Sequence, residues 1–200
     1  MRFTDGYPPA ETVPVTRDFK VCGDEKVSEE FVVDPATKGL ENVVVSLADV
    51  KRGKPFAEEE VSLTQKACAY TPHVLLVPAG QPFKILNEDG LLHNFHTYGK
   101  ANPPINRAQP KHRTEMTVQL DHPETVLVGC DIHNWMSAQI VVEDSPYYAV
   151  TDETGAFELD DVPPGDYDII ASHEGVGEMR KKVSVAPGGT AEVAFRITPR

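Results

Sequence analysis

Residues 129–136 read Gly-Cys-Asp-Ile-His-Asn-Trp-Met, and this stretch decides how the rest of the 200-residue chain is interpreted. It places the thiol of Cys130, the imidazole of His133 and the thioether of Met136 at successive intervals of three residues. The stretch lies between two runs that are typical of strands, so we predict a loop here. Side chains at this spacing on one loop can converge on a single metal ion.

A second imidazole is available far upstream. Residues 92–96 read Leu-His-Asn-Phe-His and follow a predicted turn after a strand. Because side chains alternate along a strand, His93 and Phe95 share one face, while Asn94 and His96 share the other. His93 is therefore the better candidate ligand. His96 is either a rim or core residue, or an additional ligand of this or a second ion.

This donor set favours copper. Two imidazoles, one thiolate and one thioether form the ligand set expected at a blue-copper electron-transfer site, because the sulfur donors suit Cu(I) and imidazole accepts both oxidation states. Zinc also binds histidine and cysteine, but a thioether is a weak partner for it. Cys130 is the only cysteine on the loop, so we expect one ion and no dinuclear, thiolate-bridged centre.

These residues carry a resemblance to a known family. The segment 72–89, followed by His93-Asn94 and then by the loop 130–136, resembles the small cupredoxins (type 1 blue copper proteins), of the amicyanin and plastocyanin type. The resemblance implies a Greek-key β-sandwich with one Cu(I)/Cu(II) ion near one end. It implies four ligands, two supporting residues and an electron exit at the more exposed imidazole; the ligands are His93, Cys130, His133 and Met136, Asn94 ties the ligand loops together, Trp135 deepens the apolar shell, and His133 is the exit.

The C-terminal part carries another resemblance. Residues 151–159 and 164–168 resemble the carboxypeptidase regulatory-like, transthyretin-like β-sandwich, which implies a smaller, non-catalytic module. The combination of a cupredoxin with this module resembles proteins labelled methylamine-utilisation-like. The predicted fold is therefore all-β, with two sandwiches.

Short runs rich in valine, isoleucine and aromatic residues indicate the strands. We predict strands at 30–33, 42–48, 73–77, 83–87, 115–120, 125–128, 138–143, 147–151, 156–159, 166–172, 180–185 and 191–197. Only 49–61 could hold a short helix, and the proline-rich stretch 98–113 is expected to be a loop.

The predicted organisation has four parts. Residues 1–18 form an extended arm, 19–65 are N-terminal strands, 66–145 are the copper domain, and 146–200 are the second sandwich. Five strands are few for a complete sandwich, so residues 19–65 could supply the missing ones. In that arrangement the copper domain is inserted into the other domain.

The net charge of -12 argues against nucleic acid or anionic membrane as the main partner. No apolar run is long enough to span a bilayer, and the first residues lack the apolar core of a secretory signal. An exported protein whose leader has been removed would look the same. Cys22 and Cys68 are either two inert thiols or, in an exported copper protein, a disulfide, which would fit a periplasmic or extracellular location.

The resulting hypothesis is an exported, non-enzymatic carrier of single electrons between redox partners. The stretch 98–113 contains Lys100, Arg107, Lys111 and Arg113 without an acidic residue, and we expect it to dock an acidic redox partner near the copper end. One alternative is a copper chaperone, storage or structural module. Another is a subunit that feeds electrons to an attached enzyme.

Overall fold

The computed structural model describes residues 1–50 and 53–198. Almost all regular structure in these residues is strand, and the α-helix found among them is α1 (Phe19–Cys22). A short helix was considered within 49–61, but none is present in residues 49–50 and 53–61. Residues 51 and 52 lie outside the described residues. The prediction of an all-β fold is confirmed.

The chain divides into two compact units. We call residues 11–27 and 57–144 the inserted unit, and residues 1–10, 28–56 and 145–200 the terminal unit, because the latter holds both ends of the chain. Compared with the expected copper domain 66–145, the inserted unit begins nine residues earlier, at Ala57, and also takes residues 11–27.

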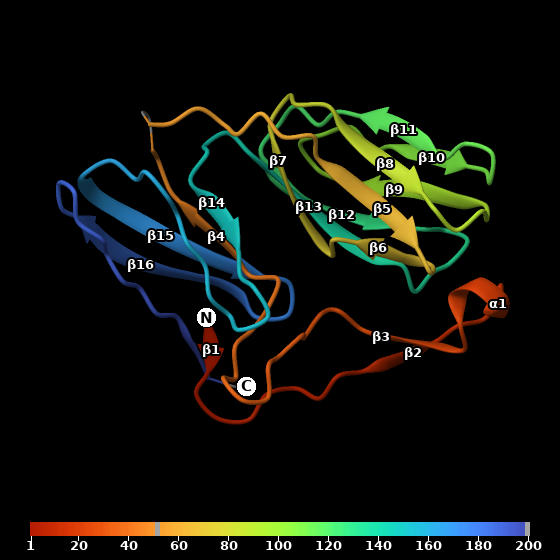
Figure 1. The fold of residues 1–200 in the computed structure, drawn as a ribbon, viewed down its shortest axis with the longest axis horizontal. Coiled ribbons are helices and arrows are strands. Elements are labelled where there is room, and N and C mark those ends of the chain that lie inside the picture. The colour runs from red at the N-terminus through yellow and green to blue at the C-terminus, as the bar shows by residue number, and fades with distance from the viewer. Residues whose placement is uncertain (51–52, 199–200) are drawn as a thin grey trace. The chain divides into compact units, whose positions relative to one another are not determined.

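The inserted unit contains two sheets (Figure 1). The five-stranded sheet has the order β10 (Asn106–Gln109), β9 (His93–Tyr98), β12 (Glu124–Gly129), β13 (Ser137–Glu143) and β7 (Val74–Pro78). The four-stranded sheet has the order β11 (Glu115–Val118), β8 (Phe83–Asn87), β5 (Ser62–Lys66) and β6 (Ala69–Thr71). The chain crosses repeatedly between the sheets, as expected of a Greek-key sandwich.

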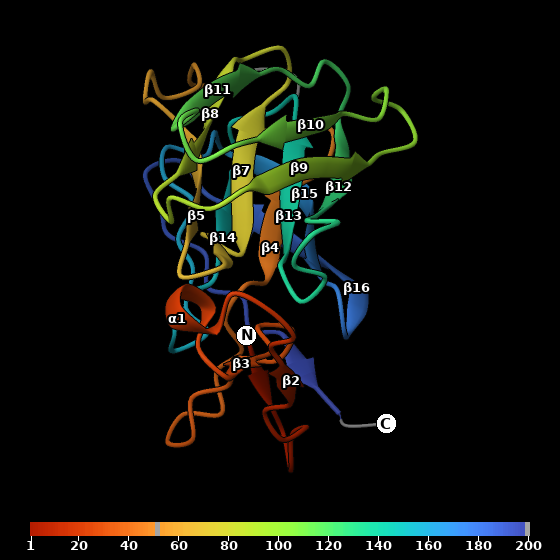
Figure 2. The same ribbon diagram turned by 90° about the vertical axis from the view of Figure 1, so that its right-hand side faces the viewer.

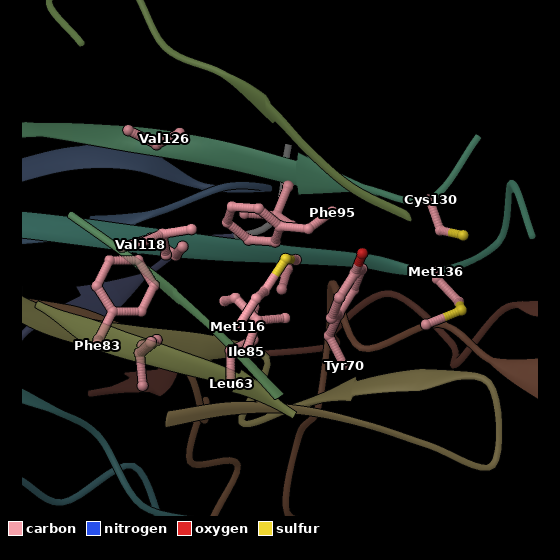
Figure 3. Packing of buried hydrophobic residues seen from close by; sticks show 14 of the residues in the cluster. Leu63, Tyr70, Phe83, Ile85, Phe95, Met116, Val118, Val126, Cys130 and Met136 are labelled. Atoms are coloured by element: carbon pink, nitrogen blue, oxygen red, sulfur yellow. The ribbon is translucent and has the colours of Figure 1, made fainter. Parts of the chain in front are cut away.

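Alternation along the strands builds the core between the sheets. In β12, Val126 and Val128 are buried, while Leu127 is about half exposed. Phe83 and Ile85 of β8 contribute in the same way, and Figure 3 shows them packed with Phe95 in the shared cluster. Each fully buried large apolar side chain stabilises the fold by about 1.5–3 kcal/mol.

Residues 11–27 form a small hairpin with a helical turn. β2 (Thr12–Pro14) pairs antiparallel with β3 (Glu25–Val27), and α1 lies in the connection between them. A disulfide joins Cys22 at the end of α1 to Cys68, which lies in the turn between β5 and β6. Of the residues 1–18 that were expected to form an extended arm, 11–18 are therefore built into the inserted unit and 1–10 into the terminal unit.

The terminal unit is centred on a four-stranded sheet of order β14 (Tyr148–Val150), β4 (Val44–Leu47), β15 (Gly165–His173) and β16 (Gly177–Val185). β1 (Arg2–Phe3) and β17 (Arg196–Ile197) form a separate parallel pair. β4 comes from the N-terminal part of the chain and pairs with both β14 and β15. Residues between the two segments of the inserted unit thus complete the sheet formed by residues after it.

Several predicted strands are wrong. Residues 156–159 are not a strand, because the Asp152 side chain accepts hydrogen bonds from the N–H groups of Thr154 and Ala156 and turns the chain locally. The range 30–33 holds only an isolated bridge at Val33, and 191–197 is strand only at its last two residues.

The expected loop 98–113 contains a strand, β10, which forms an edge of the five-stranded sheet (Figure 2). Within the described residues, no helix is long and apolar enough to cross a membrane.

Candidate metal centre

Two adjacent strands and one loop position the candidate ligands. His93 is the first residue of β9, and Cys130 directly follows β12. These strands pair with each other, with Gly129 opposite His96. The loop from Cys130 then turns through a hydrogen bond from the N–H of Met136 to the carbonyl of His133 before β13 begins.

The donor atoms converge. The Sγ atom of Cys130 lies 3.9 Å from the Nδ1 atoms of both His93 and His133, and these two Nδ1 atoms are 2.9 Å apart. Both histidines have 0% exposure and Cys130 has 4%, so the donors are shielded from water. One thiol and two imidazole nitrogens in this arrangement can bind a single copper ion.

Met136 belongs to the same end of the core. Its side chain is buried in the cluster that contains Cys130, and Figure 3 shows the two sulfur atoms at the same end of that cluster. The thioether therefore adds a soft donor type beside the thiol, as copper favours.

Carboxylates contact the outer nitrogens of both imidazoles. Asp89 Oδ2 lies 2.9 Å from His93 Nε2, and Asp18 Oδ2 lies 2.9 Å from His133 Nε2. Such contacts orient an imidazole so that its other nitrogen can bind a metal. The expectation that His133 is the more exposed imidazole is wrong, because the side chains of His93 and His133 are both completely buried.

The electrostatics favour a thiolate in the metal-free protein. Burial raises the pKa of the Cys130 thiol, but hydrogen bonds with His93 and with the backbone of Asn94 and His133 lower it further, to about 6. Burial lowers the pKa of His93, whereas Asp89 and Cys130 raise it, to about 9. The thiolate is the form of cysteine that binds metals.

Asn94 connects the two segments that carry the ligands. Its Oδ1 accepts a hydrogen bond of 2.6 Å from the N–H of Asp131, and its Nδ2 donates to the Asp131 carboxylate at 2.9 Å. The buried Tyr70 hydroxyl lies 2.8 Å from the carbonyl of Asn94 and 3.1 Å from that of Gly129. These contacts fix the end of β12 against the start of β9.

Trp135 contacts a candidate ligand, whereas His96 contacts Asp131. The Trp135 ring is 5.2 Å from that of His133, and its Nε1–H donates to the carbonyl of Cys68 at 3.1 Å. His96 instead directs Nδ1 toward Asp131 Oδ1, at 2.8 Å. Among the described residues, His96 is in none of the groups of three converging metal-binding side chains.

Sequence reasoning missed both carboxylates. Asp89 precedes His93 by four residues in the turn after β8, a spacing that could have suggested the contact. Asp18 is 115 residues from His133, and its only available signal was the expected disulfide of nearby Cys22.

Comparison with known proteins gives matches for both parts of the chain. The family model of the carboxypeptidase regulatory-like domain matches residues 136–198. Comparison with curated protein sequences finds no match.

Among solved structures, amicyanin from Paracoccus versutus is 15% identical, with a TM-score of 0.38, over 50% of this chain and 97% of that chain. A purple cupredoxin from Nitrosopumilus maritimus is 16% identical, with a TM-score of 0.36, over 42% of this chain and 100% of that chain. A copper-containing nitrite reductase from Thermus scotoductus SA-01 is 20% identical, with a TM-score of 0.40, over 50% of this chain; the match spans only 25% of the reductase.

Proposed function

We propose that this chain carries single electrons by means of one copper ion, which His93, Cys130 and His133 would hold, with Met136 as a further, weaker donor. The observation that carries the proposal is the convergence of the thiol and the two Nδ1 atoms in a fully buried position. When bound, copper supplies a one-electron couple between Cu(I) and Cu(II).

The surrounding residues would keep the donors fixed while the charge changes. Asp89 orients His93, and Asn94 ties the loop of Cys130 to β9. Trp135 packs against His133 and limits the access of water. Donor atoms held in fixed positions would move little when the metal gains or loses an electron, which suits an electron carrier.

Burial supports a carrier over a copper chaperone or storage module. A chaperone passes its ion to another protein through accessible ligands, whereas Cys130 here is only 4% exposed. On this proposal the chain is not itself an enzyme; it serves a redox enzyme or another carrier.

The proposed location is the periplasm or the extracellular space. The Cys22–Cys68 disulfide supports it, because structural disulfides persist in oxidising compartments. We also propose that an acidic redox protein docks on the stretch 98–113, in which Lys100, Arg107 and Lys111 are exposed.

The test is metal loading of the full chain. We expect one copper per chain and an intense visible absorption from the Cu(II)–thiolate pair, together with reversible one-electron reduction. Cys130→Ser should abolish the absorption. His96→Ala should retain it and serves as the matched control on β9. Retention of the absorption in Cys130→Ser would refute the assigned thiolate ligand.

A further inference from the structure

The hairpin 11–27, which we call the imidazole cover, is anchored beside the candidate metal centre. The Cys22–Cys68 disulfide fixes one end of α1, and Val15 is buried in the same core cluster as Cys130. The Nζ atom of Lys26 also donates to the carbonyl of Ala67. The cover is thus held by a covalent bond, an apolar contact and a hydrogen bond.

The cover brings the disulfide and a carboxylate to the same imidazole. The sulfur atoms of Cys22 and Cys68 lie within 4.8 Å of a His133 ring nitrogen. His133 has 0% exposure, although the next residue in its loop, Asn134, is exposed. Burial of this ring therefore depends on what packs against it rather than on the depth of the loop.

Asp18 has a conformation suited to this contact. Its backbone is left-handed, with φ of 54°, a region that aspartate, asparagine and glycine tolerate better than other residues. Although Asp18 is the N-cap residue of α1, its side chain makes no capping hydrogen bond. Its carboxylate instead contacts His133 Nε2 at 2.9 Å, from a side chain that is 41% exposed.

We propose that Asp18 is a positioning residue of the metal centre. By accepting a hydrogen bond from Nε2–H of His133, the carboxylate selects the tautomer whose Nδ1 lone pair points toward Cys130 and His93. The contact also closes the outer edge of the imidazole to water. The identity of the metal as copper rests on the proposed function, whereas the selection of the tautomer does not.

The disulfide couples this contact to the equivalent one at His93. The N–H of Cys22 donates to the backbone carbonyl of Asp18 at 3.0 Å, and the N–H of Cys68 donates to Asp89 Oδ2 at 2.8 Å. The two bonded cysteines therefore each hold one of the aspartates that contact an imidazole. The inserted unit uses one crosslink to support both imidazoles.

The test compares Asp18→Gly with Asp18→Asn and Asp24→Gly in the full chain. Glycine and asparagine both tolerate the left-handed backbone, so the variants alter the carboxylate without straining the turn. Asp24 is exposed in the same segment and is the matched control for lost charge. The first readout is the ¹⁵N spectrum of the metal-free protein. We expect one His133 tautomer, protonated at Nε2, in the native chain and in Asp24→Gly, and a mixture in Asp18→Gly.

The second readout is affinity for Cu(II) and for Co(II). We expect Asp18→Gly to bind both about 10- to 100-fold more weakly, Asp18→Asn to bind with intermediate affinity, and Asp24→Gly to match the native chain. An unchanged tautomer and affinity in Asp18→Gly would overturn the proposal. If Asp18→Gly does not fold, equal affinities for Asp18→Asn and the native chain would overturn it. A native chain without the copper–thiolate absorption would refute the proposed function, while the tautomer readout would still decide the role of Asp18.

Discussion

At the scale of single residues, one carboxylate closes the turn between β9 and β10. Glu124 accepts hydrogen bonds from the N–H groups of Lys100, Ala101 and Asn102, at 2.7 to 3.1 Å. Desolvation raises the pKa of Glu124, but these N–H groups lower it more, to about 2 from the ordinary 4.5. Because the folded pKa is the lower one, this stabilisation is fully present above pH 4.5 and is lost as the pH falls through about 2.

We therefore expect Glu124→Gln to lower the free energy of unfolding by about 1 kcal/mol at pH 7, a modest value because Glu124 is only partly buried. The difference from the native chain should shrink as the pH falls from 4.5 toward 2. Urea unfolding of the metal-free protein at pH 7 and at pH 2.5 measures both values, with the exposed Glu58→Gln as control. An equal loss at the two pH values would contradict the role of the charged form.

Residue patterns predicted the candidate ligands better than their surroundings. The three-residue spacing between Cys130, His133 and Met136 is a local signal. Strand alternation separated His93 from His96, and in the structure His93 converges with Cys130 whereas His96 contacts Asp131. The contact of Asp18 with His133 depends on tertiary structure across 115 residues. No local pattern in the sequence could reveal it.

At the scale of elements, strands with an apolar alternation were predicted and polar ones were missed. β8 agrees with its predicted range of 83–87, whereas β5 reads Ser-Leu-Thr-Gln-Lys and gave no apolar signal. Gln65 of β5 is nevertheless completely buried, because its side chain bonds to the buried Gln109 of β10. A polar residue can face the core when a distant strand supplies an acceptor for its N–H group, as Gln109 Oε1 does for Gln65 Nε2.

β10 supports the docking prediction at the same scale. Gln109 pairs with His93, so Arg107 and Lys111 flank the position opposite a candidate ligand. We expect Lys100, Arg107 and Lys111, all changed to Glu, to slow oxidation of the Cu(I) protein by anionic hexacyanoferrate(III) about tenfold at low ionic strength. The loss should diminish at high salt, because ions screen the attraction.

The matched control reverses three consecutive basic residues on β16 in the terminal unit, Arg180, Lys181 and Lys182, and should leave that rate nearly unchanged. Stopped-flow absorption of the copper centre measures both rates. Equal slowing by the two triple variants would mean that net charge, rather than the stretch 98–113, governs the encounter.

At the scale of the whole molecule, the chain passes four times between the two units. The sequence suggested that N-terminal strands complete the C-terminal sheet, and β4 occupies that place. It did not indicate that residues 11–27 belong to the inserted unit, because β2 and β3 are short and polar. Only the Cys22–Cys68 disulfide, expected if the chain is an exported copper protein, connected this segment with residues near β6.

This division predicts that reduction destabilises one unit selectively. All three cysteines and the single tryptophan, Trp135, lie in the inserted unit. Opening the Cys22–Cys68 crosslink, which spans 46 residues, should cost about 4 kcal/mol in the chain-entropy model. Dithiothreitol should therefore shift the Trp135 fluorescence transition of the metal-free protein to lower urea concentration.

Amide exchange in β15 and β16, which reports the terminal unit, should change little under the same conditions. A Cys22→Ser, Cys68→Ser double variant should reproduce the shift without reductant, whereas Cys130→Ser should not, because Cys130 is not crosslinked. If reduction accelerated exchange in β15 and β16 as strongly as it lowered the Trp135 transition, the two units would unfold together. The disulfide would then stabilise the whole chain rather than the support of the metal centre.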